Sequence, residues 1–317
     1  MSGIEIVLEY IPLNIRDKLK KFVLCPKILS NDNGPKFQCN LETTTINVEE
    51  IRLRSNKPLM LKIGNKTEII DYIVKQEEIL QAFERICENS VYSYRRQICD
   101  GYITIRGGNR VGIVGSAVID NGQVININYI SSLNFRIARE KIGCSNSVIK
   151  EIIDFKNDSI HNTLIVSPPG CGKTTLLRDI IRNISNGIKT IGFYGKTVGV
   201  VDERGEIAAM YKGIPQNDIG IRTDVVDNMP KPEGMRMLVR SMCPDVIACD
   251  EIGSMADIKA IDYAMCSGVK GIFTAHGNNI DEVNRNPELS ELLNKHVFER
   301  LILLNPEKRG DAKCIYL

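Results

Sequence analysis

Apolar residues in the second half of the chain form short runs, separated by longer segments with helical spacing. The runs predict buried strands at 163–166, 198–201, 246–249 and 271–274. The segments between them predict helices at 173–184, 233–242 and 256–267. This alternation favours a parallel sheet that helices cover on both faces. Two further apolar stretches, 297–304 and 314–317, are expected to add edge strands.

The first half of the chain has a different pattern, in which helical segments precede strands. Apolar spacing predicts helices at 12–24 and 76–87, and the polar stretch 30–40 predicts a loop. Short β-like runs separated by glycines predict strands at 102–106, 111–119 and 124–130. A chain of 317 residues is expected to form two domains. We place a smaller α+β domain at 1–145 and an α/β domain at 146–317.

The strongest chemical signal lies between the first strand and the first helix of the second half. The segment matches the phosphate-loop pattern GxxxxGK[ST] except at its first position, and its residues are Ser167, Pro168, Pro169, Gly170, Cys171, Gly172, Lys173, Thr174 and Thr175. The two glycines let the backbone turn its N–H groups toward a phosphate, where a Cβ would intrude. Ser167 replaces the first glycine, so it requires a negative φ or a slightly strained turn.

These nine residues predict a binding site for ATP and Mg²⁺. The helix that begins after the loop adds the positive end of its dipole. Lys173 is expected to bridge the β- and γ-phosphates, and the Thr174 hydroxyl is expected to bind Mg²⁺.

A pair of acids supplies what hydrolysis needs beyond binding. Asp250 and Glu251 follow the strand at 246–249, at the edge where open α/β sheets bind ligands. We expect Asp250 to hold Mg²⁺ through its water shell and Glu251 to polarise the attacking water.

Two further strand ends carry candidate catalytic groups. Asp202, Glu203 and Glu206 follow the strand at 198–201, and their acids are expected to reach the same water or metal; a solvated turn is the alternative. His276 follows the strand at 271–274 and is a candidate sensor of the γ-phosphate, with a purely structural role as the alternative.

In this order, the four elements resemble the secretion ATPase superfamily of type II and type IV secretion and pilus motors. That superfamily carries a P-loop, an acidic box, a Walker B strand and a histidine box on a RecA-like core. Segments 50–54, 107–112, 131–139 and 200–204 extend the resemblance over nearly the whole chain, to a related family of ATPases from endospore-forming bacteria. The acidic box here has the order Asp-Glu-x-x-Glu instead of Glu-Asp-x-x-Glu, which leaves open whether Asp202 or Glu203 acts.

The resemblance implies a RecA-like P-loop ATPase that works at the cytoplasmic face of a membrane-embedded channel between mother cell and forespore. It also implies arginines of the N-terminal domain that reach the nucleotide. Arg136 and Arg139 are the leading candidates, and Arg106 and Arg110 are weaker ones. An arginine supplied across an interface stabilises the charge of the transition state, so we expect a ring, specifically a hexamer.

Composition narrows the remaining choices of partner and compartment. A net charge of +2 and the absence of tryptophan argue against a nucleic-acid-dependent motor, the first alternative function. The second alternative is an ATP-gated scaffold with little turnover, which would not require the full set of acids. Ten cysteines without metal-ligand spacing suggest reduced thiols. With no export signal and no apolar run of about 20 residues, we expect a cytoplasmic protein, peripheral at the membrane.

Overall fold

The computed structural model describes residues 3–24, 48–64, 66–138, 140–305 and 312–317. The chain divides into two compact units, one up to Arg139 and one from Glu140 onward. The division precedes the expected boundary after residue 145. Residues 140–145 belong with the C-terminal unit because the buried carboxylate of Asp179 accepts hydrogen bonds from the backbone N–H groups of Gly143 and Ser145, at 3.0 and 2.8 Å.

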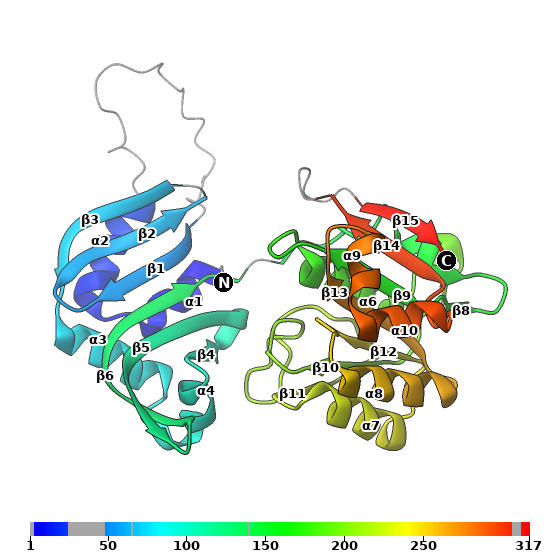
Figure 1. The fold of residues 1–317 in the computed structure, drawn as a ribbon. Coiled ribbons are helices and arrows are strands. Elements are labelled where there is room, and N and C mark those ends of the chain that lie inside the picture. The colour runs from blue at the N-terminus through cyan, green and yellow to red at the C-terminus, as the bar shows by residue number, and fades with distance from the viewer. Residues whose placement is uncertain (1–2, 25–47, 65, 139, 306–311) are drawn as a thin grey trace, which may run out of the picture. The chain divides into compact units, whose positions relative to one another are not determined.

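The N-terminal unit is an antiparallel sheet of six strands in the order β3-β2-β1-β6-β5-β4 (Figure 1). Its strands are β1 (Val48–Arg54), β2 (Lys57–Ile63), β3 (Lys66–Val74), β4 (Tyr102–Ile105), β5 (Asn109–Asp120) and β6 (Gln123–Arg136). Its helices are α1 (Gly3–Tyr10), α2 (Leu13–Leu24), α3 (Gln76–Ile86) and α4 (Arg95–Cys99). In β1, Ile51 and Leu53 are buried in one core with Ile79 and Phe83 of α3, whereas Arg52 is exposed on the other face.

The sequence predicted part of this unit. The predicted helices at 12–24 and 76–87 correspond to α2 and α3, and the three predicted strands lie on β4, β5 and β6. Strands β1, β2 and β3 and helix α1 were not predicted as elements. The predicted loop at 30–40 lies outside the described residues.

The C-terminal unit is built on a sheet of seven strands in the order β11-β10-β12-β13-β9-β14-β15. All neighbouring strands are parallel except β14 and β15, which are antiparallel. The strands are β9 (Thr163–Ser167), β10 (Val198–Asp202), β11 (Thr223–Asp227), β12 (Val246–Cys249), β13 (Lys270–His276), β14 (Arg300–Leu304) and β15 (Ala312–Tyr316). A separate hairpin joins β7 (Ile153–Asp154) and β8 (Ser159–Ile160).

Helices cover both faces of this sheet, as the strand pattern predicted (Figure 1). They are α5 (Ile149–Ile152), α6 (Lys173–Asn186), α7 (Lys231–Ser241), α8 (Met255–Cys266), α9 (Ile280–Arg285) and α10 (Pro287–Asn294). Val246 and Ala248 of β12 pack in the core that contains α6, and Ile247 and Cys249 pack in the core that contains α7 and α8. A strand buried on both faces has no polar side to alternate with, which explains its continuous apolar sequence.

The edges of this sheet differ from the prediction. The stretch 297–304 was expected at an edge, but β14 lies inside the sheet between β9 and β15. The opposite edge is β11, which was not predicted because its sequence, Thr-Asp-Val-Val-Asp, has only two apolar residues. Within the described residues, no helix is long and apolar enough to cross a membrane.

Candidate active site

The phosphate loop lies where the sequence places it, between β9 and α6. Ser167 ends β9 and is buried, and its φ is not positive, so the loop tolerates a side chain at this position. Gly170 and Gly172 have φ values of +77° and +98°. A Cβ built on either glycine meets no atom within 4 Å. Within the chain itself, the glycines are therefore needed for their left-handed backbone conformation.

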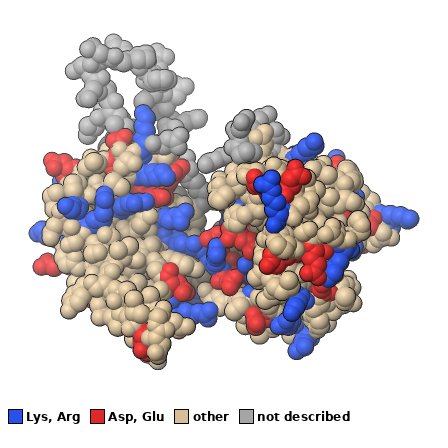
Figure 2. Space-filling view, viewed as in Figure 1, with Lys and Arg blue, Asp and Glu red and all other residues tan. Residues whose placement is uncertain are grey.

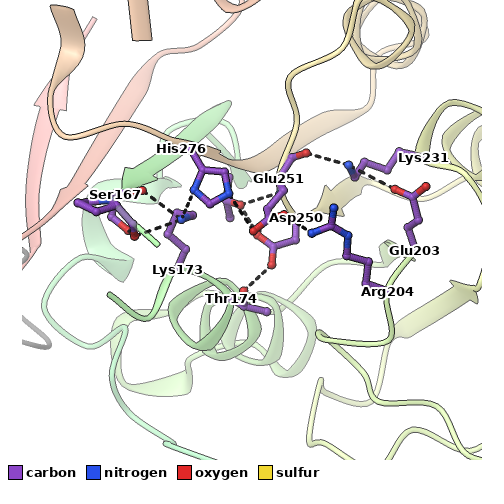
Figure 3. Close-up of polar contacts among 11 residues, drawn as sticks. Ser167, Lys173, Thr174, Glu203, Arg204, Lys231, Asp250, Glu251 and His276 are labelled. Atoms are coloured by element: carbon purple, nitrogen blue, oxygen red, sulfur yellow. Dashed lines mark hydrogen bonds and ion pairs between the residues drawn. The ribbon is translucent and has the colours of Figure 1, made fainter. Parts of the chain in front are cut away.

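Lys173 is held over the loop by three acceptors (Figure 3). Its Nζ lies 3.1 Å from the carbonyl oxygen of Ser167, 3.4 Å from that of Pro168 and 3.1 Å from Nδ1 of His276. Burial lowers the pKa of Lys173, whereas the nearby carboxylates of Asp250 and Glu251 act in the opposite direction.

The first turn of α6 also touches the strand-end acids. The Thr174 hydroxyl donates a hydrogen bond to one oxygen of Asp250, and the Thr274 hydroxyl of β13 donates to the other. Asp250 thereby links the P-loop helix to β13. No group of three or more His, Cys, Asp or Glu side chains in the described part of the chain could hold a metal ion. The Thr174 hydroxyl and the Asp250 carboxylate are hard oxygen donors that fit Mg²⁺, an ion which keeps several waters and takes few protein ligands.

Glu251 has partners on both carboxylate oxygens. Arg204 approaches Oε2 at 2.6 Å, and Nε2 of His276 lies 3.0 Å from Oε1. Because Nδ1 of His276 accepts from the Lys173 ammonium, Nε2 carries the proton that faces Glu251. Lys173, His276, Glu251 and Arg204 thus form one continuous polar chain (Figure 3). Glu251 has a φ of +53°, a left-handed conformation that is uncommon for this residue type.

The structure gives the three acids after β10 different surroundings. Asp202 is only 2% exposed, and its carboxylate accepts hydrogen bonds from the backbone N–H groups of Glu206, Ile207 and Ala208 at 2.8 to 3.1 Å. Burial raises the pKa of Asp202, and these N–H groups oppose the rise. Its contacts make Asp202 an anchor of the acidic loop, and the catalytic role expected for it stays a prediction.

Glu203 and Glu206 are more accessible than Asp202. Glu203 is paired with Lys231 of α7 at 3.3 Å. The backbone oxygen of Glu206 accepts a hydrogen bond from Arg178 of α6 at 2.7 Å. The three acids, Asp250 and Glu251 line a single pocket, together with Val201, Arg204 and Lys231. The predicted convergence of strand ends at one rim of the sheet is therefore what the structure shows.

The predicted arginines belong to the N-terminal unit. Arg136 is exposed at the end of β6, opposite Glu50 of β1 and Arg110 of β5. Arg106 pairs with Glu9 of α1 at 2.8 Å. Arg139 lies outside the described residues.

Sequence reasoning missed several residues that hold the site together. Lys231 donates to the backbone oxygen of Glu251 at 2.8 Å in addition to its contact with Glu203. The Thr274 hydroxyl accepts from the Glu251 backbone N–H at 2.9 Å. Arg204 and Arg178 complete the set. Arg204 lies inside the acidic motif, so its position in the sequence could have marked it as a site residue. Lys231 follows the unpredicted strand β11, and no motif in the sequence marks it.

A family model described as "Sporulation stage III, protein AA" matches residues 31–317. The chain belongs to this family. It is 39% identical over 276 residues to stage III sporulation protein AA of Bacillus subtilis (strain 168), covering 87% of this chain and 88% of that protein. It is 30% identical over 217 residues to the protein ycf45 of Porphyra purpurea, covering 66% of this chain and 35% of that protein. The expected resemblance to sporulation ATPases is confirmed at the level of the family.

Solved structures define the fold class of this member of the sporulation stage III protein AA family. The pilus retraction motor PilT with bound ADP matches with a TM-score of 0.55 at 15% identity, over 81% of this chain and 74% of PilT. The ATPase DotB of Legionella pneumophila matches with a TM-score of 0.53 at 16% identity, over 81% of this chain and 72% of DotB. The fold is that of the RecA-like secretion ATPases, as predicted.

Replacing Asp202 by Asn tests its role as an anchor. An amide NH₂ cannot accept from the backbone N–H groups that face it, so we expect the free energy of unfolding to fall by about 2–4 kcal/mol. Urea denaturation measures the change. The exposed Asp224 of β11 provides the matched control, and Asp224→Asn should change stability by less than about 0.5 kcal/mol. Unchanged stability of Asp202→Asn together with lost ATP hydrolysis would instead place Asp202 in the chemistry.

Proposed function

We propose that the C-terminal unit binds Mg-ATP and hydrolyses it, and that the chain is the ATPase of a secretion-like membrane complex in endospore formation. The observation that carries the proposal is the polar chain from Lys173 through His276 to Glu251. It connects the residue expected to bind phosphate with the residue expected to activate water. Family membership supports the sporulation role, and the fold supports nucleotide binding.

In the proposed reaction the loop binds the triphosphate through its backbone N–H groups and Lys173. Thr174 and Asp250 would hold Mg²⁺, which neutralises charge on the β- and γ-phosphates. Glu251 accepts a proton from the water that attacks the γ-phosphorus as the bond to the ADP oxygen breaks. A water-activating carboxylate needs a lone pair available for that proton.

The contacts of Glu251 bear on when it can act. Arg204 and His276 each engage one of its oxygens, which occupies part of the acceptor capacity of the carboxylate, and loss of the His276 contact would free a further site for the attacking water. The Lys173 ammonium contacts His276 as well as the carbonyl oxygens of the loop. A phosphate that draws this ammonium away would therefore also break its hydrogen bond to His276. We propose that His276 reports the γ-phosphate to Glu251 in this way.

The N-terminal unit is proposed to complete the site in a ring, with six subunits as the expected number. Arg136 is the proposed source of the added positive charge, with Arg139 as its companion. The complex is proposed to act at the cytoplasmic face of the membrane, with the ATPase as a peripheral subunit.

Glu251→Gln tests the assignment of the base. The amide keeps the shape of the side chain but cannot accept the proton, so ATP affinity should stay within about threefold while turnover falls by about 10²- to 10⁴-fold. Calorimetry measures affinity, and phosphate release measures turnover. Glu203→Gln is the matched control, because Glu203 lines the same pocket, and it should retain most of the turnover. Lost turnover in Glu203→Gln, with normal turnover in Glu251→Gln, would move the base to the acidic loop.

Arg136→Ala tests the contribution of the N-terminal unit. If Arg136 stabilises charge that grows in the transition state, its loss should lower turnover of the assembled form by about 10³-fold or more. The affinity of the unassembled chain for ATP should stay nearly unchanged. Arg52→Ala is the control, because Arg52 is also an exposed arginine of this sheet. Turnover of Arg136→Ala equal to that of Arg52→Ala would refute the role.

A further inference from the structure

The hairpin formed by β5 and β6 extends beyond the rest of its sheet (Figure 1). β4 pairs with β5 only along Asn109–Gly112, whereas β5 continues to Asp120. From residue 114 to residue 120, β5 has a strand partner on one side only among the described strands. We call this stretch the outer edge of β5. Alternate residues of such an edge direct their backbone N–H and C=O groups away from β6.

The hairpin lacks the charged residues that usually protect such an edge. Residues 111–130 contain one charged side chain, that of Asp120, and no proline. Soluble proteins commonly protect an edge strand with lysine, proline or a bulge. The two register shifts of this pair both place their extra residues in β6, because β6 advances further than β5 at each shift. The outer edge of β5 therefore remains regular.

Apolar side chains are exposed along both strands of the hairpin. Exposure is 60% for Val114, 65% for Ile119, 38% for Val124 and 82% for Tyr129. The surface around the end of the hairpin is mostly uncharged (Figure 2). Val114 and Ile119 are an odd number of positions apart and therefore lie on opposite faces of the hairpin, so apolar side chains are available on both faces of a strand added at this edge.

Tyr129 lies at one of the register shifts and has a φ of +48°. This left-handed conformation is unfavourable for an aromatic residue, and strained backbone concentrates at functional sites. Gly115 faces the shift from β5, where an added Cβ would come within 2.5 Å of the Asn128 carbonyl oxygen. The close approach of the two strands beside Tyr129 thus depends on Gly115.

We propose that the outer edge of β5 and Tyr129 bind an uncharged, extended segment of a partner protein as an added strand. The unpaired backbone groups supply the hydrogen bonds of strand addition, and the exposed apolar side chains contact alternate residues of the segment.

The charges and the backbone of the hairpin disfavour other occupants. Residues 111–130 contain no cation, and Arg95 of α4, which donates to the Ile125 carbonyl oxygen at 3.3 Å, adds one, whereas nucleic acids and anionic lipid headgroups require several. Insertion into hydrocarbon would leave the backbone groups of the open edge without partners. Pairing of two β5 edges from two copies of the chain is a two-fold contact, which would not build the ring of the proposed function.

Hydrogen exchange on the full chain tests the proposal. The probe is a capped synthetic peptide with the sequence of residues 123–131. This part of β6 already pairs with the other side of β5, so its sequence is suited to strand pairing. The peptide should slow exchange at the outward amides of 114–120 by at least tenfold. The same peptide with alternate amides N-methylated should not protect them. ATP hydrolysis does not enter the readout, so the result is independent of the proposed enzymatic function.

Two substitutions sharpen the test. Ala117→Lys places a charge in the middle of the outer edge and should weaken peptide binding by at least tenfold, whereas Ala256→Lys on the exposed surface of α8 should leave binding unchanged. Tyr129→Gly removes the backbone strain, so it should raise the melting temperature and weaken binding.

Three results would overturn the proposal. One is the absence of protection at millimolar peptide, and another is equal protection by the N-methylated peptide. The third is protection that appears without peptide and grows with protein concentration, since this would identify a second copy of the chain as the occupant.

Discussion

The candidate active site depends on the position of β13 between β9 and β12. Ser167 of β9 pairs with His276 of β13, and Cys249 of β12 pairs with Phe273. Parallel strands in this register bring their carboxyl ends to one rim. The phosphate loop, the acids at 250–251 and His276 come together there although about 110 residues separate the first from the last. A one-residue slip of β13 would turn the side chains of that strand, including His276, to the other face of the sheet.

Helix α6 links that rim to the segments on either side of it. Its first turn carries Lys173 and Thr174, and further along it Arg178 holds two backbone carbonyls of the acidic loop at 2.7 and 2.8 Å. The next residue, Asp179, is 3% exposed and binds the backbone of 143–145, where the chain enters the C-terminal unit. A shift of α6 would therefore change the contacts of the phosphate loop, of the acidic loop and of the segment where the chain enters this unit. Under the proposed function, nucleotide binding at the first turn of α6 would therefore affect the acidic loop and the entry segment together.

The sequence predicted most of what local pattern controls. β12 occupies the predicted 246–249, and α6 begins at the predicted Lys173, because a doubly buried strand and a glycine-rich loop before a helix both have clear patterns. The role of Asp202 could not be predicted, since its burial depends on residues 206–208 turning back over the carboxylate. Lys231 and Arg204 were missed because their partners lie on other elements, and β1 to β3 were missed because charged residues interrupt their apolar alternation.

The most direct test of the account is the Mg-ATP hydrolysis rate per subunit over a wide range of protein concentration, with Lys173→Ala as the blank. Lys173 is the buried cation of the phosphate loop, so the variant should remove both binding and turnover. We expect hydrolysis above the blank, with a rate per subunit that rises with concentration as sites are completed between subunits. A rate equal to that of Lys173→Ala at every concentration would contradict it.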